Sequence, residues 1–285
     1  MGNNSHVLFG RRSIATFTAA ALLGSALVAL SPAAHASDDR DGTVSIAEVQ
    51  HSLESLRESS GDLLANPIGS KAQGDAAAVA TTDSGISIEI PIEAADGVSL
   101  RNTDGSAFRI GLPQADNEAA LLSDGSVVYT SENSTASTVI PTEAGVQMLT
   151  TITDQSAPTR FPYHVGLGPG QIIQLTDNGG AVIVNADGVS EMTVAPAWAE
   201  DAIGQSIPTH YEIEGEALVQ VVEHTSTPGV AYPIVADPFW IPWIAARCLL
   251  GLGLNWAMIA RIASLPAGGI QAAFGYAAAR CLMGR

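Results

Sequence analysis

The pattern that decides the fold is first seen from Gly85 to Leu100, where the sequence reads GISIEIPIEAADGVSL. Isoleucine alternates with polar residues from Ile86 to Ile90, as expected of a strand with one buried face. The pair Asp96-Gly97 then tolerates the positive φ angles that a tight hairpin turn requires. This stretch therefore predicts two antiparallel strands joined by a short turn.

The same pattern continues as far as Asp237. Short β-branched runs alternate with Asp-Gly or Asn-Gly pairs that are typical of hairpin turns. The runs are 126–130, 146–152, 171–175, 181–184 and 217–222, and the pairs are Asp104-Gly105, Asp124-Gly125, Asn178-Gly179 and Asp187-Gly188. Residues 85–237 are therefore expected to form an acidic, mainly β domain, either an antiparallel β-sandwich or an open barrel.

Residues 1–36 are expected to be an export signal. Arg11 and Arg12 precede an apolar run from Ile14 to Leu30, and Ala34-His35-Ala36 has the small-x-small pattern of a cleavage site. Cleavage between Ala36 and Ser37 is expected, so the mature protein is secreted or attached to the cell envelope. The sequence leaves the Sec and twin-arginine routes open.

Residues 37–84 are expected to form one helix followed by a linker. From Thr43 to Ser60, apolar residues recur at helical spacing, and Ser45 with Glu48 forms a capping-box pattern. Residues 66–84 are rich in Ala, Gly, Ser and Asp without a period, which indicates a linker.

The last segment, residues 238–285, differs sharply in charge from the chain before it. It has four arginines and no acidic residue, whereas residues 37–237 have 29 acidic and six basic residues, a net charge of −23. An acidic body repels phosphate backbones, so nucleic-acid binding is not expected.

The segment 238–285 is predicted to be a hydrophobic helical hairpin. Pro266 and Gly268-Gly269 break its apolar run, so two helices and a turn are expected. Cys248 lies about 27 Å before Pro266 along a helix, and Cys281 lies about 22 Å after it. The two cysteines of the chain therefore come to similar heights, and a disulfide between them is predicted.

Two roles for this hairpin remain open at the level of the sequence. Arg247 and Arg261 enclose too few uncharged residues for a membrane span, which needs about 20. The hairpin either packs on the β domain or another copy, or it lies at a membrane interface or on an envelope protein. In the second case the contact residues are expected to be Trp240, Trp243, Arg247, Trp256 and Arg261. The oligomeric state stays open.

No motif in the chain identifies a reaction. His210, Glu212 and Glu214 alternate in a way that aligns them on one strand face, but a solvated acidic face is the preferred interpretation. A nucleophile elbow is absent, which disfavours a hydrolase. No catalytic residue, cofactor or metal is therefore predicted.

The second half of the β region resembles a known group. Its residues include Asp201-Ala202-Ile203-Gly204, and it ends in Tyr232-Pro233-Ile234-Val235-Ala236-Asp237-Pro238. It is similar to the β-rich module of secreted, uncharacterised actinobacterial proteins, which ends in a Tyr-Pro-Val/Ile-x-x-Asp-Pro strand. The resemblance implies a secreted β module without known catalytic residues. A short apolar segment follows here instead of a wall-associated repeat array, so the role of a repeat protein does not carry over.

The sequence thus predicts a secreted, non-enzymatic protein. Its acidic β domain would carry the apolar, weakly basic segment to a membrane or a partner. In the strongest form of this hypothesis, the segment is released near Asp237-Pro238 as a bacteriocin-like peptide. The alternatives are an envelope binding module that recognises a wall glycan or protein and, as a less favoured alternative, a secreted hydrolase.

Overall fold

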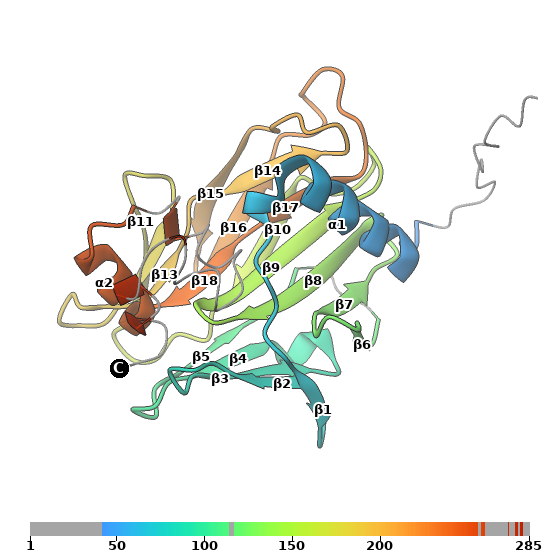
Figure 1. The fold of residues 1–285 in the computed structure, drawn as a ribbon. Helices are drawn as coiled ribbons and strands as arrows, with labels where there is room; N and C mark the ends of the chain where they lie inside the picture. Colours follow the sequence, from blue (N-terminus) through green and yellow to red (C-terminus); the bar gives the residue numbers. More distant parts are fainter. Residues whose placement is uncertain are drawn as a thin grey trace, which may run out of the picture. The chain divides into compact units, whose positions relative to one another are not determined.

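The computed structural model describes residues 42–113, 117–255, 258–259, 273, 277–278 and 280–281. Its architecture is mainly β, with antiparallel strand pairing and few helices (Figure 1). This confirms the predicted fold class at the level of antiparallel β-structure with an N-terminal helix. The expected export signal and its cleavage site lie outside the described residues.

The N-terminal part of the β-structure is a five-stranded sheet in which each strand pairs with the next along the chain. Its strands are β1 (Lys71–Gln73), β2 (Ala76–Thr81), β3 (Ser87–Pro91), β4 (Val98–Arg101) and β5 (Ala107–Ile110). Two of these strands occupy the segment 66–84, so the prediction of a linker there was wrong. Strand β2 is mostly alanine and is buried along most of its length, which removes the alternation that marks a one-sided strand.

A larger sheet of ten strands in the described part follows the order β11-β12-β13-β18-β9-β8-β7-β6, with β14 and β17 joined to it through β9. The long β8–β9 hairpin, Thr135–Thr142 and Gly145–Ile152, is buried at every position. The other strands are β6 (Ala120–Leu121), β7 (Val127–Thr130), β11 (Ile172–Leu175), β12 (Ala181–Val184), β13 (Ser190–Val194), β14 (Trp198–Asp201), β17 (Ile234–Asp237) and β18 (Phe239–Pro242).

A third sheet contains three strands in the order β10-β16-β15. Their bounds are Arg160–His164 for β10, Thr209–Glu214 for β15 and Ala217–Val222 for β16. Phe161 and Tyr163 of β10 are fully buried and belong to the main hydrophobic cluster, together with residues of both other sheets. The three sheets therefore share one core.

Strands β17 and β18 form one nearly continuous line of pairing along β9. Ala236 pairs with Thr150, the carbonyl of Pro238 accepts from the amide of Met148, and Phe239 pairs with Gln147. On the side away from β9, β17 pairs with β14, and β18 pairs with β13. The junction expected between residues 237 and 238 thus lies inside the large sheet, and Phe239–Pro242 is part of its centre.

Helix α1, Ile46–Ser60, begins at the predicted capping box. The hydroxyl Oγ of Ser45 accepts from the amide of Glu48, and the Glu48 carboxylate accepts from the amide of Ser45 at 2.9 Å. Its buried residues Val49, Leu53 and Leu56 join a second hydrophobic cluster with Leu149, Val235 and Ile241 of the large sheet. Figure 1 shows α1 lying across this face of the sheet.

Helix α2, Trp243–Gly251, is the only long run of helix described after the large sheet. It starts directly after Pro242, as the sequence indicated, but it ends at Gly251 rather than continuing toward Leu265. Leu252 and Gly253 form a turn, in which the amides of both residues bond back to carbonyls of α2, and Gly253 has a φ angle of 79°. The predicted helical hairpin is therefore not supported, and residues 260–272 lie outside the described part. No described helix is long and apolar enough to span a membrane.

Candidate functional site

The candidate site lies where α2 meets two hairpin turns. Ala245, Ala246 and Leu249 of α2 are buried in the second hydrophobic cluster, which fixes the orientation of the helix. Arg247 and Cys248 of the same helix are exposed. The apolar face of α2 thus sets the direction of its polar residues.

The predicted disulfide between Cys248 and Cys281 is present. The two Cα atoms are 5.4 Å apart, across a sequence separation of 33 residues. Cys281 is only 8% exposed, and Ile259 and Ala278 are buried in the same cluster as the inner face of α2. The disulfide therefore fastens the end of the chain to α2, and through α2 to the large sheet.

An open cleft of about 630 Å³ lies beside this disulfide. Residues from three parts of the chain line it: the β4–β5 turn, the β12–β13 turn with the start of β13, and the C-terminal segment. The lining residues are Asn102, Asp104, Ser106, Val189, Ser190, Glu191, Trp243, Arg247, Cys248, Arg280 and Cys281. We call this cleft, with its lining residues, the disulfide cleft.

The charged side chains that line the disulfide cleft differ in whether they have hydrogen-bond partners. Oδ1 of Asp104 accepts from the amide and hydroxyl of Ser106, which lower the pKa of Asp104. Glu191 accepts from the side-chain amides of Gln171 and Asn185. Arg247, by contrast, makes no ion pair or hydrogen bond through its guanidinium within the described part of the chain. An anion entering the cleft therefore finds a guanidinium without a competing partner.

The cleft also holds an acceptor without a donor. The amide Nδ2 of Asn102 donates to the hydroxyl of Ser106 at 2.9 Å. Its oxygen Oδ1 is buried and has no hydrogen-bond partner in the described structure. A buried acceptor left unpaired costs free energy, on the order of 1–3 kcal/mol. Because this oxygen is buried, a ligand in the cleft does not reach it unless the side chain of Asn102 turns.

The predicted contact residues are only partly brought together. Trp243 and Arg247 both line the disulfide cleft. Trp240 is fully buried in β18, with its ring centroid 6.2 Å from that of Tyr163, so it forms part of the core instead of a contact surface. Trp256 and Arg261 lie outside the described residues. Asn102, Glu191 and Arg280 were not predicted, because they come from distant parts of the chain and the sequence gives no signal that these parts meet in one cleft.

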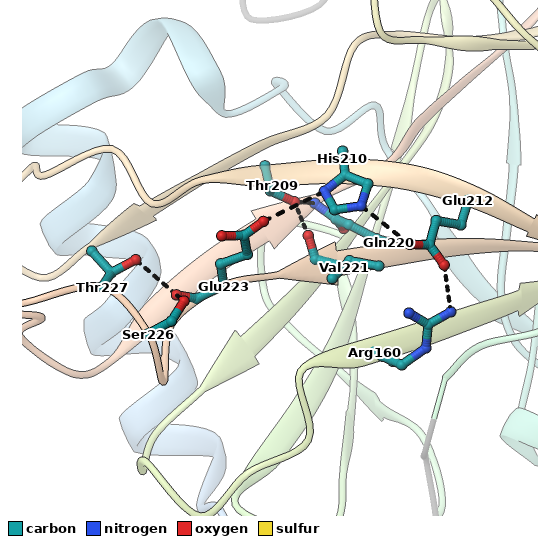
Figure 2. Close-up of polar contacts among 9 residues, drawn as sticks. All are labelled: Arg160, Thr209, His210, Glu212, Gln220, Val221, Glu223, Ser226 and Thr227. Carbon is teal, nitrogen blue, oxygen red and sulfur yellow. Dashed lines mark hydrogen bonds and ion pairs between the residues drawn. The ribbon is translucent and has the colours of Figure 1, made fainter.

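The acidic strand face around His210 carries a surface network of charges (Figure 2). Arg160 bonds Glu212 at 2.7 Å and Glu214 at 2.5 Å. The imidazole of His210 lies between two carboxylates, 3.3 Å from Glu212 and 3.9 Å from Glu223. Hydrogen bonds from Arg160 and His210 lower the pKa of Glu212.

The network accounts for this strand face without a metal. Arg160 occupies carboxylate oxygens of both glutamates that a metal would need. Among the described residues no group of three His, Cys, Asp or Glu side chains has the arrangement of a metal site. The interpretation of this face as a solvated acidic strand is the one that the contacts favour.

A second histidine, His224, is buried, with 2% of its surface exposed. Its Nδ1 lies 2.8 Å from the hydroxyl of Tyr232 and its Nε2 lies 3.1 Å from the carbonyl of Pro158. Within the described structure neither His224 nor His210 is hydrogen-bonded to a serine hydroxyl. No described contact therefore assembles a serine, a histidine and a carboxylate.

The two aspartates of the quoted motifs are buried, and Asp201 bonds the backbone of a loop. Asp201 is 4% exposed, and its carboxylate accepts from the amides of Ile203, Gln205 and Ala231 at 2.8–3.0 Å. Asp237 is 1% exposed, and burial raises its pKa to about 8, against the opposing effect of hydrogen bonds from Gln147 and Trp198. Neither residue lines the disulfide cleft.

No protein-family model matches this chain, and no sequence among the curated proteins matches it.

Proposed function

We propose that this protein is an exported, non-enzymatic binding protein of the cell envelope, and that the disulfide cleft is its contact surface. The observation that carries the proposal is Arg247, an unpaired guanidinium in a cleft built from three separate parts of the chain. Ligand sites of proteins are typically concave, with a few polar groups converging on an otherwise apolar lining.

Export is supported by the disulfide and by the expected signal segment. Disulfides persist in oxidising compartments and are rare in the cytosol of most organisms. The resemblance to secreted actinobacterial β modules belongs to the same proposal. Asp201 and Asp237 match positions that recur in the motifs of those modules. Here both residues are buried, and Asp201 accepts hydrogen bonds from the backbone, which fits a structural module.

According to this proposal, the C-terminal segment acts while it is still joined to the β-structure. Release after Asp237 would separate β17 from β18 in the middle of the large sheet, where both strands pair with β9. A fragment starting at Pro238 would also remove the buried side chains of Phe239, Trp240 and Ile241 from the core. The bacteriocin-like form of the hypothesis is therefore not part of the proposal.

A membrane surface is a second candidate for the contacted structure. Leu252 and Met258, next to α2 in the sequence, are 46% and 42% exposed. Exposed apolar side chains beside arginines are typical of segments that lie in the interface of an anionic membrane. Binding to a wall component and binding to a membrane are distinguished by whether cell-wall polymer or lipid vesicles retain the protein.

The test is co-sedimentation of the full mature chain with two separate materials: lipid-free cell-wall polymer, and vesicles containing phosphatidylglycerol. Arg247→Glu reverses the charge in the cleft, and Arg57→Glu, on the exposed face of α1, is the matched control. We expect the wall polymer to retain the parent protein and the control, and to release Arg247→Glu by at least tenfold.

Equal retention of all three proteins, or retention of none, would contradict a contact surface at the disulfide cleft. Retention on vesicles alone, with loss in Arg247→Glu, would keep the site and assign it to the membrane surface.

A further inference from the structure

The lining of the disulfide cleft specifies the chemistry of its occupant. Its lining groups are of three kinds: a cation at Arg247, carboxylate acceptors at Asp104 and Glu191, and a partly exposed indole at Trp243. A complementary ligand brings an anionic group, hydrogen-bond donors and an apolar face. These three requirements exclude many common ligands.

Simple anions and lipid head groups meet only part of these requirements. A phosphate satisfies Arg247 but offers neither an apolar face for Trp243 nor, when fully ionised, a donor for the lining carboxylates. A peptide rich in acidic residues brings several negative charges to a body with a net charge of −23 over residues 37–237, so it is repelled more strongly than a ligand with a single carboxylate.

A sugar ring that carries a carboxylate meets all three. The C–H face of a pyranose packs on an aromatic ring, because the negative face of the ring attracts the weakly positive hydrogens. Ring hydroxyls donate to the carboxylates of Asp104 and Glu191, which accept hydrogen bonds. The carboxylate binds a guanidinium in a two-point geometry that a lysine does not reproduce.

We propose that the disulfide cleft binds an acidic saccharide, with the sugar face on Trp243, ring hydroxyls on the carboxylates of Asp104 and Glu191, and the carboxylate on Arg247. This inference rests on the proposed function and names the ligand class of the same site. The cleft, at about 630 Å³, lies within the range of roughly 300–1,000 Å³ typical of small-molecule pockets.

The disulfide has a direct part in this site. Arg280 precedes Cys281, and both residues line the cleft with Arg247 and Cys248 on the other side of the bond. The covalent link therefore brings a second guanidinium-bearing segment to the same cleft. Reduction is expected to weaken binding of the acidic saccharide at least tenfold, because the segment with Arg280 is then no longer tied to α2.

The test is isothermal titration calorimetry of the full mature chain with two disaccharides that differ in one group. The acidic probe is N-acetylglucosamine linked to N-acetylmuramic acid, and the neutral probe is di-N-acetylchitobiose, which lacks the lactyl carboxylate. We expect the acidic probe to bind at least tenfold more tightly than the neutral one. Arg247→Gln is expected to remove that difference, and Trp243→Ala to weaken both probes.

Two controls accompany the titration. Arg57→Gln, on α1, is expected to leave both affinities unchanged, and unaltered urea unfolding shows that each variant is folded. Absence of binding of either probe to the folded parent protein overturns the inference, as does binding that Arg247→Gln leaves unchanged. If wall or vesicle retention still depends on Arg247 when no saccharide binds, the ligand class is wrong while the proposed contact surface stands.

Discussion

The side chains of Asp237 and Gln147 meet in the interior of the protein, where Nε2 of Gln147 lies 3.4 Å from Oδ2 of Asp237. The same amide nitrogen donates to the carbonyl of Leu63 at 2.8 Å, and its oxygen Oε1 accepts from the amide of Ala65 at 2.8 Å. Gln147 thus connects the segment after α1 to the point where β17 passes into β18. The N-terminal and C-terminal parts of the described chain are joined at this buried centre.

Stability is expected to fall as the pH rises between about 4 and 8. Burial raises the pKa of Asp237 from 3.8 to about 8, so the folded state keeps a proton that the unfolded state loses. The contribution of Asp237 to the free energy of unfolding is fully present below its pKa in the unfolded state. It is lost as the pH rises toward its pKa in the folded state. Urea unfolding at pH 5 and pH 8 measures this loss, which we expect to be on the order of several kcal/mol.

The matched variant is Asp237→Asn, which has a similar shape and cannot ionise. We expect its free energy of unfolding to depend less on pH than that of the parent protein, and to exceed the parent value at pH 8. Identical pH slopes for the two proteins would show that Asp237 does not stay protonated in the folded state.

Removal of the disulfide is expected to destabilise the protein. The double variant Cys248→Ser/Cys281→Ser frees a loop of 33 residues, and the chain-entropy model gives a loss of roughly 3–4 kcal/mol. Thermal unfolding of the parent protein with and without reductant measures the same effect independently. A reductant that leaves the melting temperature unchanged would argue against a stabilising disulfide.

Asp201→Ala is expected to lower the free energy of unfolding by about 2–4 kcal/mol. Three buried or half-buried backbone amides lose the carboxylate that accepts from them, and such unpaired donors cost about 1 kcal/mol or more each. Asp187→Ala is the control, because this exposed turn aspartate accepts no described hydrogen bond through its side chain. Urea unfolding curves that shift equally for both variants would contradict this role of Asp201.

Gly145→Ala is expected to cost more than about 2 kcal/mol. A Cβ at this position lies 2.1 Å from the carbonyl oxygen of Trp240, and the φ angle of 149° is unfavourable for other residues. Gly61→Ala is the comparison, since its φ is −56° and nothing lies within 4 Å of the added Cβ. Equal stability of the two variants would show that β9 and β18 do not approach as closely as described.

The features that depend on local physical chemistry could be predicted from the sequence. The capping box at Ser45 and Glu48 forms as expected, because both partners lie within one helical turn. The Asp-Gly turns at Gly97 and Gly125 have positive φ angles of 70° and 94°, as their hairpins require. The pairing of Cys248 with Cys281 was also confirmed, since no other cysteine competes.

The features that depend on distant parts of the chain could not be predicted from the sequence. Strand β2 was missed because buried alanines carry no alternating pattern. Pro238 and the change in charge after it suggested a domain boundary, yet pairing with β9 on both sides of Pro238 carries the sheet across it. Half of the disulfide cleft comes from the β4–β5 and β12–β13 turns, whose meeting with α2 depends on the packing of whole sheets.

We expect the C-terminal segment to remain joined to the β-structure and to act at the envelope as part of one chain. The decisive measurement is intact-mass spectrometry of the protein recovered from the culture medium and from the envelope, with and without reductant. We expect a single chain from Ser37 to Arg285 in the envelope fraction, lighter by two hydrogen atoms before reduction. A separate fragment beginning after Asp237 would contradict it.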